Sequence, residues 1–373
     1  MENLRNPRVL GTQYRVYDKD GKYKRTIDKT DEKNLDESDW LKGVTCFVIN
    51  EKGEVLIEVR ANKGLTPGKN DLCSGHLDND ETETQAMVRE LKEELGISFT
   101  EKDAIFLKEV KRDKKVPDFK DLWIFQKNIS INEITFPDGE ATEAKWVTIK
   151  QFINMYNNKE IVPTIDFGEE EYKLAVEILK KKKLERYYDN TEADTPKKNV
   201  KYFVDNISTT SGKAIDIGCG SGNDSVYLIK NGWSVVSIDK ENVGERISKR
   251  LDAEEQKRFK FQQQNFNDMK LEKADLIVAN YSLPFCNNEK INYVWKNIVN
   301  SIRTNGYFVG NFFGIKDSWN KAESNMTFFT KEQVLNLFDE FDIIKFNEVE
   351  KEGLTGLGNM KYWHIFNVIA KKK

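Results

Sequence analysis

The chain has 373 residues, of which 38% are hydrophobic and 32% are charged. This length exceeds what one hydrophobic core usually serves, so we expect two domains in a soluble globular protein. The net charge of −3 excludes a strong overall field toward nucleic acid or anionic lipid. No apolar run approaches the roughly 20 residues of a membrane span. The first residues lack the apolar core of a signal peptide and the cysteines are scattered, so we expect the cytoplasm.

Strands dominate the beginning of the chain. Residues 14–17 form a first candidate, and residues 44–50 and 54–60 flank a glycine turn, which predicts a hairpin. Residues 71–74 are expected to form the strand that leads into the next helix. Two further strands are expected at residues 104–110 and 122–129, followed by a helix that begins near Thr148.

Residues 75–97, GHLDNDETETQAMVRELKEELGI, contain a predicted helix with an acidic face. Glu90, Glu93 and Glu94 lie three and four positions apart, so the spacing predicts that their carboxylates converge on one face. Their like charges weaken the helix by roughly a few tenths of a kcal/mol per pair. Such a face either stays in solvent or binds a cation. Gly96 is expected to end the helix.

This stretch resembles the Nudix box, G-x5-E-x7-R-E-U-x-E-E-x-G-U, in which U is aliphatic. Every fixed position matches: Gly75, Glu81, Arg89, Glu90, Leu91, Glu93, Glu94, Gly96 and Ile97. The resemblance implies that Glu90, Glu93 and Glu94 are ligands for Mg²⁺ or Mn²⁺, and that Arg89 orients carboxylates by pairing with Glu81. In such a site the metal activates water for substitution at phosphorus, so the implied substrate is a nucleoside diphosphate linked to another group.

The segment before the helix at Thr148 resembles the isopentenyl-diphosphate-isomerase-like branch of Nudix domains, which carries E-x-x-E-x-x-W here. This resemblance makes Glu140 and Glu143 candidate carboxylates near the metal; the alternative is that they are solvated loop acids. His76 follows the first glycine of the box and is a candidate contact for substrate phosphates. The catalytic cysteine motif of the isomerase is not recognisable, which disfavours isomerase chemistry.

A helix is expected over residues 169–183, where it ends in four lysines. These lysines either complement the dipole at the end of the helix or contact phosphate or nucleic acid. Residues 185–199 are polar and show no periodicity. We therefore place the domain boundary near residue 184, which gives domains over residues 1–183 and 184–373.

Residues 213–241 read as strand, glycine turn, helix and strand, the opening unit of a doubly wound sheet. Three glycines allow the turn to approach a ligand: Gly218, Gly220 and Gly222. Asp239 ends the second strand, where a carboxylate can bind ribose hydroxyls. A dinucleotide-binding fold is the rival interpretation, but the third glycine of its fingerprint would fall at Asn223. Asp216 also suits an ammonium group better than a pyrophosphate.

Residues 185–373 as a whole resemble class I methyltransferases that use S-adenosylmethionine (SAM), most closely the small-molecule enzymes of the tellurite-resistance type. The turn at residues 216–222 matches their first motif and Asp239 their second-strand acid. Asn265 and Phe266 fall at the adenine contacts, and Asn280 and Tyr281 at the sulfonium. The implied cofactor-binding residues are Asp216, Gly218, Gly220, Gly222, Asp239, Asn265, Phe266, Asn280 and Tyr281.

Methyl transfer depends on positioning and exclusion of water, so the methyl acceptor is expected where strands four and five of the sheet end. The candidate residues there are Ser282, Phe285, Asn311, Phe313, Asp317 and Trp319, although packing explains Phe313 and Trp319 about as well. Residues 280–285 lack the N-P-P-Y signature of enzymes that methylate nucleic-acid amino groups, which leaves the acceptor open. Residues 341–350 and 362–373 are expected to form the closing hairpin, with His364 as a structural histidine.

We therefore predict a two-domain protein of the α/β and α+β classes: a Nudix α/β/α sandwich with a mixed sheet, then a Rossmann-like doubly wound sheet with an antiparallel final hairpin. The predicted function is bifunctional, with Mg²⁺-dependent hydrolysis of a nucleoside-diphosphate-linked substrate and SAM-dependent methylation of a small molecule or nucleotide. Two alternatives stay open: a Nudix module that senses a ligand and regulates the methyltransferase, and an enzyme that modifies RNA 5′ ends. Lysine-rich residues 111–115 and 180–183 favour the RNA alternative, whereas the pI of about 5.8 disfavours it. No membrane partner is expected.

Overall fold

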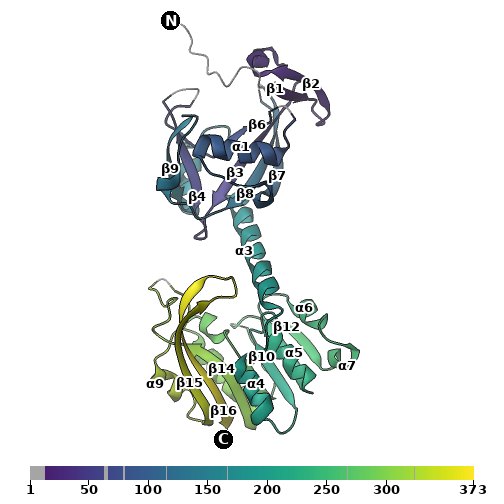
Figure 1. Ribbon diagram of the computed structural model, residues 1–373, viewed down its shortest axis with the longest axis vertical. Helices are drawn as coiled ribbons and strands as arrows, with labels where there is room; N and C mark the ends of the chain where they lie inside the picture. The colour runs from purple at the N-terminus through teal and green to yellow at the C-terminus, as the bar shows by residue number, and fades with distance from the viewer. Residues whose placement is uncertain are drawn as a thin grey trace. The chain divides into compact units, whose positions relative to one another are not determined.

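The computed structural model describes residues 13–62, 66–78, 80–114, 116–165, 167–266, 268–322 and 324–373. Lys115, part of one lysine-rich segment, lies outside this description. The chain divides into two compact units, Met1–Lys182 and Lys183–Lys373. Each unit has its own sheet (Figure 1). Among the described helices, none combines the length and the apolar character needed to cross a membrane.

A mixed sheet with the strand order β5-β4-β3-β8-β7 forms the centre of the first unit. These strands are β3 (Leu41–Ile49), β4 (Val55–Arg60), β5 (Asn70–Asp71), β7 (Ile105–Arg112) and β8 (Asp118–Gln126). β3 runs parallel to β8, whereas the other pairs are antiparallel. β6 (Ser74–His76) pairs with β3, and β9 (Ala141–Val147) pairs with β4. A separate two-stranded sheet consists of β1 (Gln13–Tyr17) and β2 (Tyr23–Asp28).

Helices cover both faces of this sheet, which confirms the predicted α/β/α sandwich. α1 (Glu83–Leu95) packs Met87 and Leu91 into a core with Val44 of β3. On the other face, Phe152 of α2 (Ile149–Asn157) and Tyr172 of α3 (Glu169–Thr191) share a second core with the sheet. The described 3-10 turns are η2 (Lys29–Asn34), η3 (Glu101–Asp103), η4 (Ile131–Glu133) and η5 (Leu283–Phe285).

The acidic helix α1 is fixed at both ends by its own sequence. Thr82 accepts a hydrogen bond from the Gln85 amide at 3.3 Å, and the Gln85 side chain accepts one from the Thr82 amide at 3.0 Å. Gly96 ends the helix with φ of 67°, and a Cβ there would lie 2.0 Å from the hydroxyl of Thr135. Both ends of α1 are therefore fixed, and with them the positions along the helix from which its carboxylates project.

The second unit is a seven-stranded sheet with the order β12-β11-β10-β13-β14-β16-β15. Its strands are β10 (Lys213–Ile217), β11 (Ser234–Asp239), β12 (Phe259–Gln263), β13 (Ala274–Ala279), β14 (Ile302–Phe313), β15 (Phe341–Leu354) and β16 (Met360–Lys372). The first five strands in this order are parallel, and β16 lies antiparallel between β14 and β15. The predicted doubly wound sheet with an antiparallel final hairpin is confirmed.

Two apolar cores lie on opposite faces of this second sheet. One core contains residues of α4 (Lys198–Asn206), α5 (Asn223–Lys230) and α6 (Gly244–Ser248). The other contains residues of α8 (Ile291–Ser301) and α9 (Lys331–Asn336). The short helix α7 (Ala253–Gln256) precedes β12. The carboxyl ends of the parallel strands stay open between these two layers, as in other doubly wound sheets.

Two local expectations are wrong. Residues 71–74 do not form one strand but divide into β5 and β6, with Leu72 and Cys73 between them. Residues 185–191 are helical, because α3 continues to Thr191 and buries Tyr188 in the core of the second unit. The lysines at 180–183 therefore lie within a helix and not at its C-terminal end, so the helix dipole does not explain them.

Candidate functional site

In the first unit, two carboxylates of α1 face β6. A Cβ on Gly75 would lie 1.9 Å from Oε1 of Glu90, so only glycine leaves room for this carboxylate. The Ser74 amide donates a hydrogen bond to Oε2 of Glu94 at 3.2 Å, and Glu94 is 4% exposed. The first glycine of the box thus creates the space into which the acidic face of α1 fits.

Glu58 of β4 is a third buried carboxylate of this site, and sequence reasoning missed it. Glu58 is 2% exposed, and its Oε2 has no hydrogen-bond partner among the described residues. Burial raises the pKa of Glu58 to about 8, and neighbouring Asp71 adds to the shift. A glutamate in the otherwise apolar strand VLIEVR was the one signal available for it.

Burial raises the pKa of the other two carboxylates as well, and neighbouring charges add to the shift of Glu94. Burial raises the pKa of Glu90 to about 7, against the opposing charge of Arg89. Burial, followed by the charges of Glu58 and Glu90, raises the pKa of Glu94 well above its usual range. A divalent cation would replace the protons that these groups hold and would give Glu58 the partner it lacks. Because the donors are all carboxylate oxygens, the residues fit Mg²⁺ or Mn²⁺.

Arg89 connects the remaining acidic residues of the box. Its Nε and Nη2 donate hydrogen bonds to the two oxygens of Glu81 at 2.8 and 3.0 Å. Its Nη1 donates to Glu90 at 2.8 Å and to Glu93 at 3.2 Å. Such charge-assisted, two-pronged bonds fix both partners. The side chain of Glu93 stays 39% exposed, on the solvent side of this network.

The predicted convergence of Glu90, Glu93 and Glu94 is not what the structure shows. Among the described residues, the only trio of potential metal ligands with atoms within 4.8 Å of one another lies in the second unit. The reason is that Arg89 holds Glu90 and Glu93, whereas Glu94 turns inward to the Ser74 amide. By the same measure Glu58, Glu90 and Glu94 form no such trio; the structure shows that the charges of Glu58 and Glu90 both act on Glu94.

Two cations of this unit lie close to the buried carboxylates. Arg60 pairs with Asp71 at 2.9 Å, and its charge lowers the pKa of Glu58. Lys120 of β8 is 4% exposed, and burial lowers its pKa to about 8, with the charge of Arg112 acting in the same direction. Asp71 lies near both cations. Arg60 and Lys120 are therefore the cations available for a substrate phosphate, and no motif indicated either.

The other predicted residues of the first unit are His76, Glu140 and Glu143. Burial lowers the pKa of His76 to about 3, so its ring, which lies 5.3 Å from Tyr14, is neutral and offers no charge to phosphate. Glu140 lies close enough to raise the pKa of Glu58. Glu143 is exposed on β9. Of the two loop acids, Glu140 alone belongs to the electrostatic surroundings of the cluster.

In the second unit, the turn after β10 lines a cavity of about 820 Å³, here called the donor cavity. Its lining includes five of the predicted cofactor residues: Asp216, Gly218, Gly220, Asn280 and Tyr281. Gly218 and Gly220 have φ of 67° and 53°, and a Cβ on Gly218 would lie 2.3 Å from that of Ser282. Glycine is therefore required at this turn, and the volume suits a small-molecule ligand.

The other four predicted cofactor residues are absent from the described lining of the donor cavity. Asp239 accepts a hydrogen bond from the Gly220 amide at 2.9 Å and so shapes the turn. Gly222, with φ of 75°, begins α5 beside Ile247. Phe266 packs against an apolar core, and Asn265 follows β12. Their roles toward adenine and ribose stay predictions.

Two buried carboxylates give the donor cavity an acidic wall. Burial and the charge of Asp224 raise the pKa of Asp216 to about 8, and Asp216 accepts a hydrogen bond from Ser225 at 2.6 Å. Asp224, which no motif indicated, accepts from the Lys197 amide at 2.6 Å and from Asn280 at 2.8 Å. A ligand with an ammonium group would keep both carboxylates charged, so the residues fit SAM.

Aromatic side chains line the donor cavity opposite these carboxylates: Tyr281, Phe285, Phe313, Trp319 and Trp363. Lys361 lies among them, with its Nζ 3.5 Å from the ring centre of Trp319 and 4.0 Å from that of Trp363. Lys361 also pairs with buried Asp317. Trp363 and Lys361 come from the closing hairpin, more than 40 residues beyond Trp319, the last predicted acceptor residue, so spacing could not reveal them.

The remaining candidates of this unit, Asn311, Ser282 and His364, are all buried. Asn311 is 1% exposed and accepts a hydrogen bond from the Tyr281 amide at 2.8 Å. Ser282 is buried beside the turn. His364 forms with Glu348 and Glu350 the compact trio mentioned above. Its Nδ1 accepts a hydrogen bond from the Lys316 amide at 3.1 Å, and its Nε2 lies 3.1 Å from Glu348. Both ring nitrogens of His364 are thus engaged within the protein, while Glu348 and Glu350 are exposed.

Comparisons with known proteins match a different family model to each part of the chain. A family model described as NUDIX domain matches residues 40–165, and one described as Tellurite resistance protein TehB matches residues 178–354. An isopentenyl-diphosphate Delta-isomerase of Photorhabdus laumondii is 34% identical over 122 residues, which cover 32% of this chain and 66% of that protein. An uncharacterised Nudix hydrolase of Listeria innocua is 30% identical over 124 residues, 32% of this chain and 70% of that one. The chain thus spans about two thirds of the length of these relatives.

Two solved structures resemble the second unit. TehB from Haemophilus influenzae matches with a TM-score of 0.42 and 21% identity, over 51% of this chain and 67% of that one. The N-methyltransferase NodS from Bradyrhizobium japonicum, solved with S-adenosyl-L-homocysteine (SAH), matches with a TM-score of 0.39 and 15% identity, over 51% and 97%.

We predict that Mg²⁺ affinity rises with pH. Glu90 and Glu58, with pKa values of about 7 and 8, hold protons below these values, and the protons must leave before a cation binds. Calorimetric titration of the full chain with Mg²⁺ at about pH 6 and pH 8 checks this, with buffers of different ionisation enthalpy to count released protons. Equal affinity at both pH values, without proton release, would contradict it.

We also predict that Gly75→Ala displaces Glu90, because the new methyl group would lie 1.9 Å from Oε1 of Glu90. The expected result is a loss of roughly 1–3 kcal/mol of stability and a marked loss of Mg²⁺ affinity. The matched control is Gly168→Ala, whose Cβ would meet its nearest neighbour at an ordinary 3.6 Å. Thermal unfolding with and without Mg²⁺ compares the two variants. Equal behaviour of both would show that the space at Gly75 is not needed.

Proposed function

The chain belongs to the Nudix hydrolase family through its first unit and carries a TehB-type methyltransferase domain in its second, and from this premise we propose a bifunctional enzyme with two small-molecule substrates. The first unit would hydrolyse a nucleoside-diphosphate-linked compound with Mg²⁺. The second would transfer a methyl group from SAM to a small molecule or nucleotide. We propose the cytoplasm as its location.

In the proposed hydrolysis, the buried carboxylates Glu58, Glu90 and Glu94 hold the cation. A bound Mg²⁺ supplies charge neutralisation at the diphosphate and a water molecule with lowered pKa. Arg89 keeps Glu90 in place through its bonds to Glu81 and Glu93. Glu93, on the solvent side of this network, is the carboxylate in position to accept the proton of the attacking water.

In the same unit, Arg60 and Lys120 would bind the negative charge of the substrate phosphates. Both lie close to Asp71, which is 2% exposed at the end of β5, so their charges are held at the edge of the carboxylate cluster. Cations positioned in advance stabilise charge that develops on phosphate oxygens without reorganising. The P–O–P bond would break as the oxygen of water bonds to phosphorus, which releases two phosphate-bearing products.

In the proposed methyl transfer, Asp216 and Asp224 would bind the ammonium end of SAM. SAM itself supplies the activated methyl group. Asp239 holds the Gly220 turn with one oxygen, and its other oxygen accepts a hydrogen bond from the Glu241 amide at 3.0 Å, at the point where ribose is expected. The aromatic wall with Tyr281 and Trp363 excludes water and orients the acceptor.

The observation that carries the hydrolase proposal is that Oε2 of Glu58 is buried without a hydrogen-bond partner among the described residues. A charged carboxylate that is buried without a partner destabilises the folded protein by roughly several kcal/mol, unless a proton or a cation neutralises it. Its neighbours Glu90 and Glu94 belong to the Nudix box. A cation is the partner that serves all three groups at once.

We predict that Glu93→Gln lowers Mg²⁺-dependent hydrolysis by roughly 100-fold or more, because the amide cannot accept a proton. Its partial exposure keeps the fold intact, and binding of SAM should stay unchanged. Glu170→Gln, an exposed acid of α3, is the matched control. A screen of nucleoside diphosphate compounds with Mg²⁺ provides the measurement. Retained hydrolysis in the Glu93 variant would contradict the assignment, and methylation that responds to a nucleotide the wild type never hydrolyses would favour the ligand-sensing alternative.

We predict that Asp216→Asn weakens SAM binding by roughly tenfold or more, because the ammonium group loses a charged partner while the side chain keeps its size. Asp252→Asn, at the exposed start of α7, is the control. Isothermal titration with SAM measures the affinity, and thermal unfolding checks the fold. Unchanged affinity for SAM in a folded Asp216 variant would show that the acidic wall does not bind SAM.

A further inference from the structure

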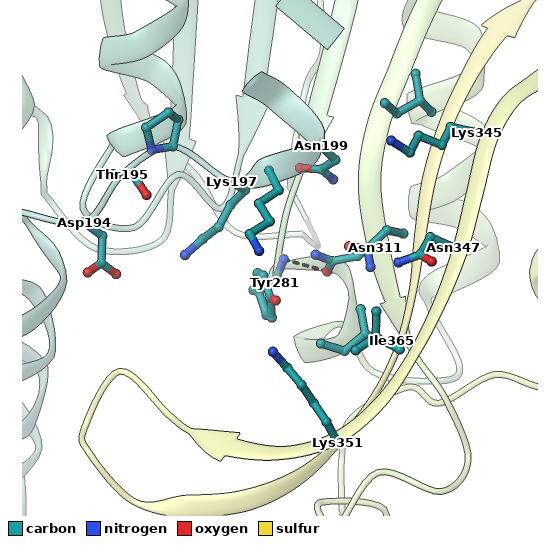
Figure 2. A pocket seen from close by; sticks show the side chains of 15 residues that line it. Asp194, Thr195, Lys197, Asn199, Tyr281, Asn311, Lys345, Asn347, Lys351 and Ile365 are labelled. Carbon is teal, nitrogen blue, oxygen red and sulfur yellow. Dashed lines mark hydrogen bonds between the residues drawn. The ribbon is translucent and has the colours of Figure 1, made fainter. Parts of the chain in front are cut away.

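A second cavity of about 510 Å³ lies beside the donor cavity in the second unit, and here it is called the Asn/Lys cavity (Figure 2). We propose that the Asn/Lys cavity binds the phosphate group of the methyl acceptor, and that the acceptor is a phosphate monoester. This inference rests on the proposed methyltransferase function. Phosphate monoesters are also the kind of product that the proposed hydrolysis in the first unit releases.

Four asparagines give the cavity its polar lining: Asn199, Asn311, Asn347 and Asn367. In the sheet, Asn311 lies opposite Asn367, and Asn367 lies opposite Asn347, so one asparagine stands on each of three neighbouring strands. Residues directly opposite one another project from the same face of a sheet. Asn199 comes from α4, and its amide donates to Asn280 at 2.7 Å. Asn199 and Asn311 already donate to Asn280, so Asn347 and Asn367 are the amides of this wall that can turn toward phosphate oxygens.

Four lysines also line the cavity: Lys197, Lys198, Lys345 and Lys351. Asp194 is the one acidic residue of the described lining, so four positive charges and one negative charge leave a net charge of +3. No described carboxylate forms an ion pair with any of these lysines. The chain as a whole has a net charge of −3. A concave surface with this local excess attracts anions more strongly than scattered surface lysines do.

α4 begins beside the cavity, and side chains already bind its first amides. The Lys197 amide donates to Asp224 at 2.6 Å, and the Val200 amide donates to the Asn199 side chain at 2.9 Å. The lysines, and not the helix end, therefore supply the positive field of the cavity. Figure 2 shows Asn199 of α4 across the cavity from Asn347, and Lys351 directed toward Tyr281.

Tyr281 connects the two cavities, because it lines both. Its backbone has φ of 52°, and its amide is held by the Asn311 side chain at 2.8 Å. Lys197 and Lys351 line both cavities as well. An acceptor with its phosphate among the asparagines therefore extends past Tyr281 into the donor cavity, where the aromatic wall can pack against the rest of the molecule.

Methyl transfer in this arrangement needs no acid or base from the lysines. The lone pair of the acceptor's nucleophilic atom forms the new bond to the methyl carbon as the carbon–sulfur bond breaks. The electron pair of that bond stays on sulfur, which becomes the neutral thioether of SAH. The proton that the acceptor's N–H or O–H loses leaves to solvent. The lysines and asparagines only position the acceptor.

The test is binding of ribose 5-phosphate to the full chain saturated with SAH, by isothermal titration at low ionic strength. Lys198 and Lys345 line the Asn/Lys cavity but not the donor cavity, so Lys198→Ala/Lys345→Ala leaves the SAH site intact. The control, Lys249→Ala/Lys296→Ala, removes the same charge from exposed positions of the same unit. We expect ribose 5-phosphate to bind the wild type and ribose not to bind. The first double variant should bind ribose 5-phosphate roughly tenfold more weakly or worse, with unchanged SAH affinity.

Two further probes make the outcome specific. Inorganic phosphate separates recognition of phosphate alone from recognition of a monoester, and we expect it to bind more weakly than ribose 5-phosphate. Lys198→Arg/Lys345→Arg keeps the charge and should restore most of the affinity. If SAH binds but ribose 5-phosphate does not, or if both alanine variants lose affinity equally, the cavity is not a phosphate site and the inference is overturned. Failure of SAH itself to bind would instead overturn the proposed methyltransferase function, and this inference with it.

Discussion

A buried carboxylate is stable only when a proton or a cation neutralises it. The stability and the candidate site of the first unit both depend on this neutralisation. Glu58, Glu90 and Glu94 come from β4 and α1 and are each desolvated by burial, and the charges of Glu58 and Glu90 further raise the pKa of Glu94. Gly75 leaves the space, and Arg89 holds the outer acids in place. The sheet and the helix are stable together only if the carboxylates are neutralised, and a divalent cation neutralises them while it also creates a catalytic centre.

The second unit uses buried acids in a related way. Asp216 and Asp224 line the donor cavity, where an ammonium group would restore their charge. The donor cavity also holds lysines, so its acidic character is local to Asp216 and Asp224, whereas lysines and asparagines line the Asn/Lys cavity beyond Tyr281. A cationic donor and an anionic acceptor would thus be held by opposite charges on neighbouring surfaces, which orders the two ligands and keeps each out of the other's place.

Sequence reasoning found the two families where their motifs consist of residues close together in the chain. The Nudix box and the glycine turn after β10 are local motifs with fixed spacing, and they led to both domains and to five residues that line the donor cavity. It failed where tertiary packing decides. Glu58 stands on a different strand from the box, and Asp224 becomes an acid of the cavity only through the bend of the turn. Trp363 and Lys361 reach the site from the closing hairpin. Helical spacing also placed Glu94 with Glu90 and Glu93, but Arg89 binds Glu90 and Glu93 while Glu94 turns to the Ser74 amide.

The central claim is that Glu58, Glu90 and Glu94 together bind a divalent cation. The most direct test is anomalous diffraction from crystals of the full chain grown with Mn²⁺. We expect a peak at about 2.0–2.3 Å from carboxylate oxygens of these three residues, near the distance of metal–oxygen bonds. No peak in the first unit, or a peak only at Glu348, Glu350 and His364, would contradict the account.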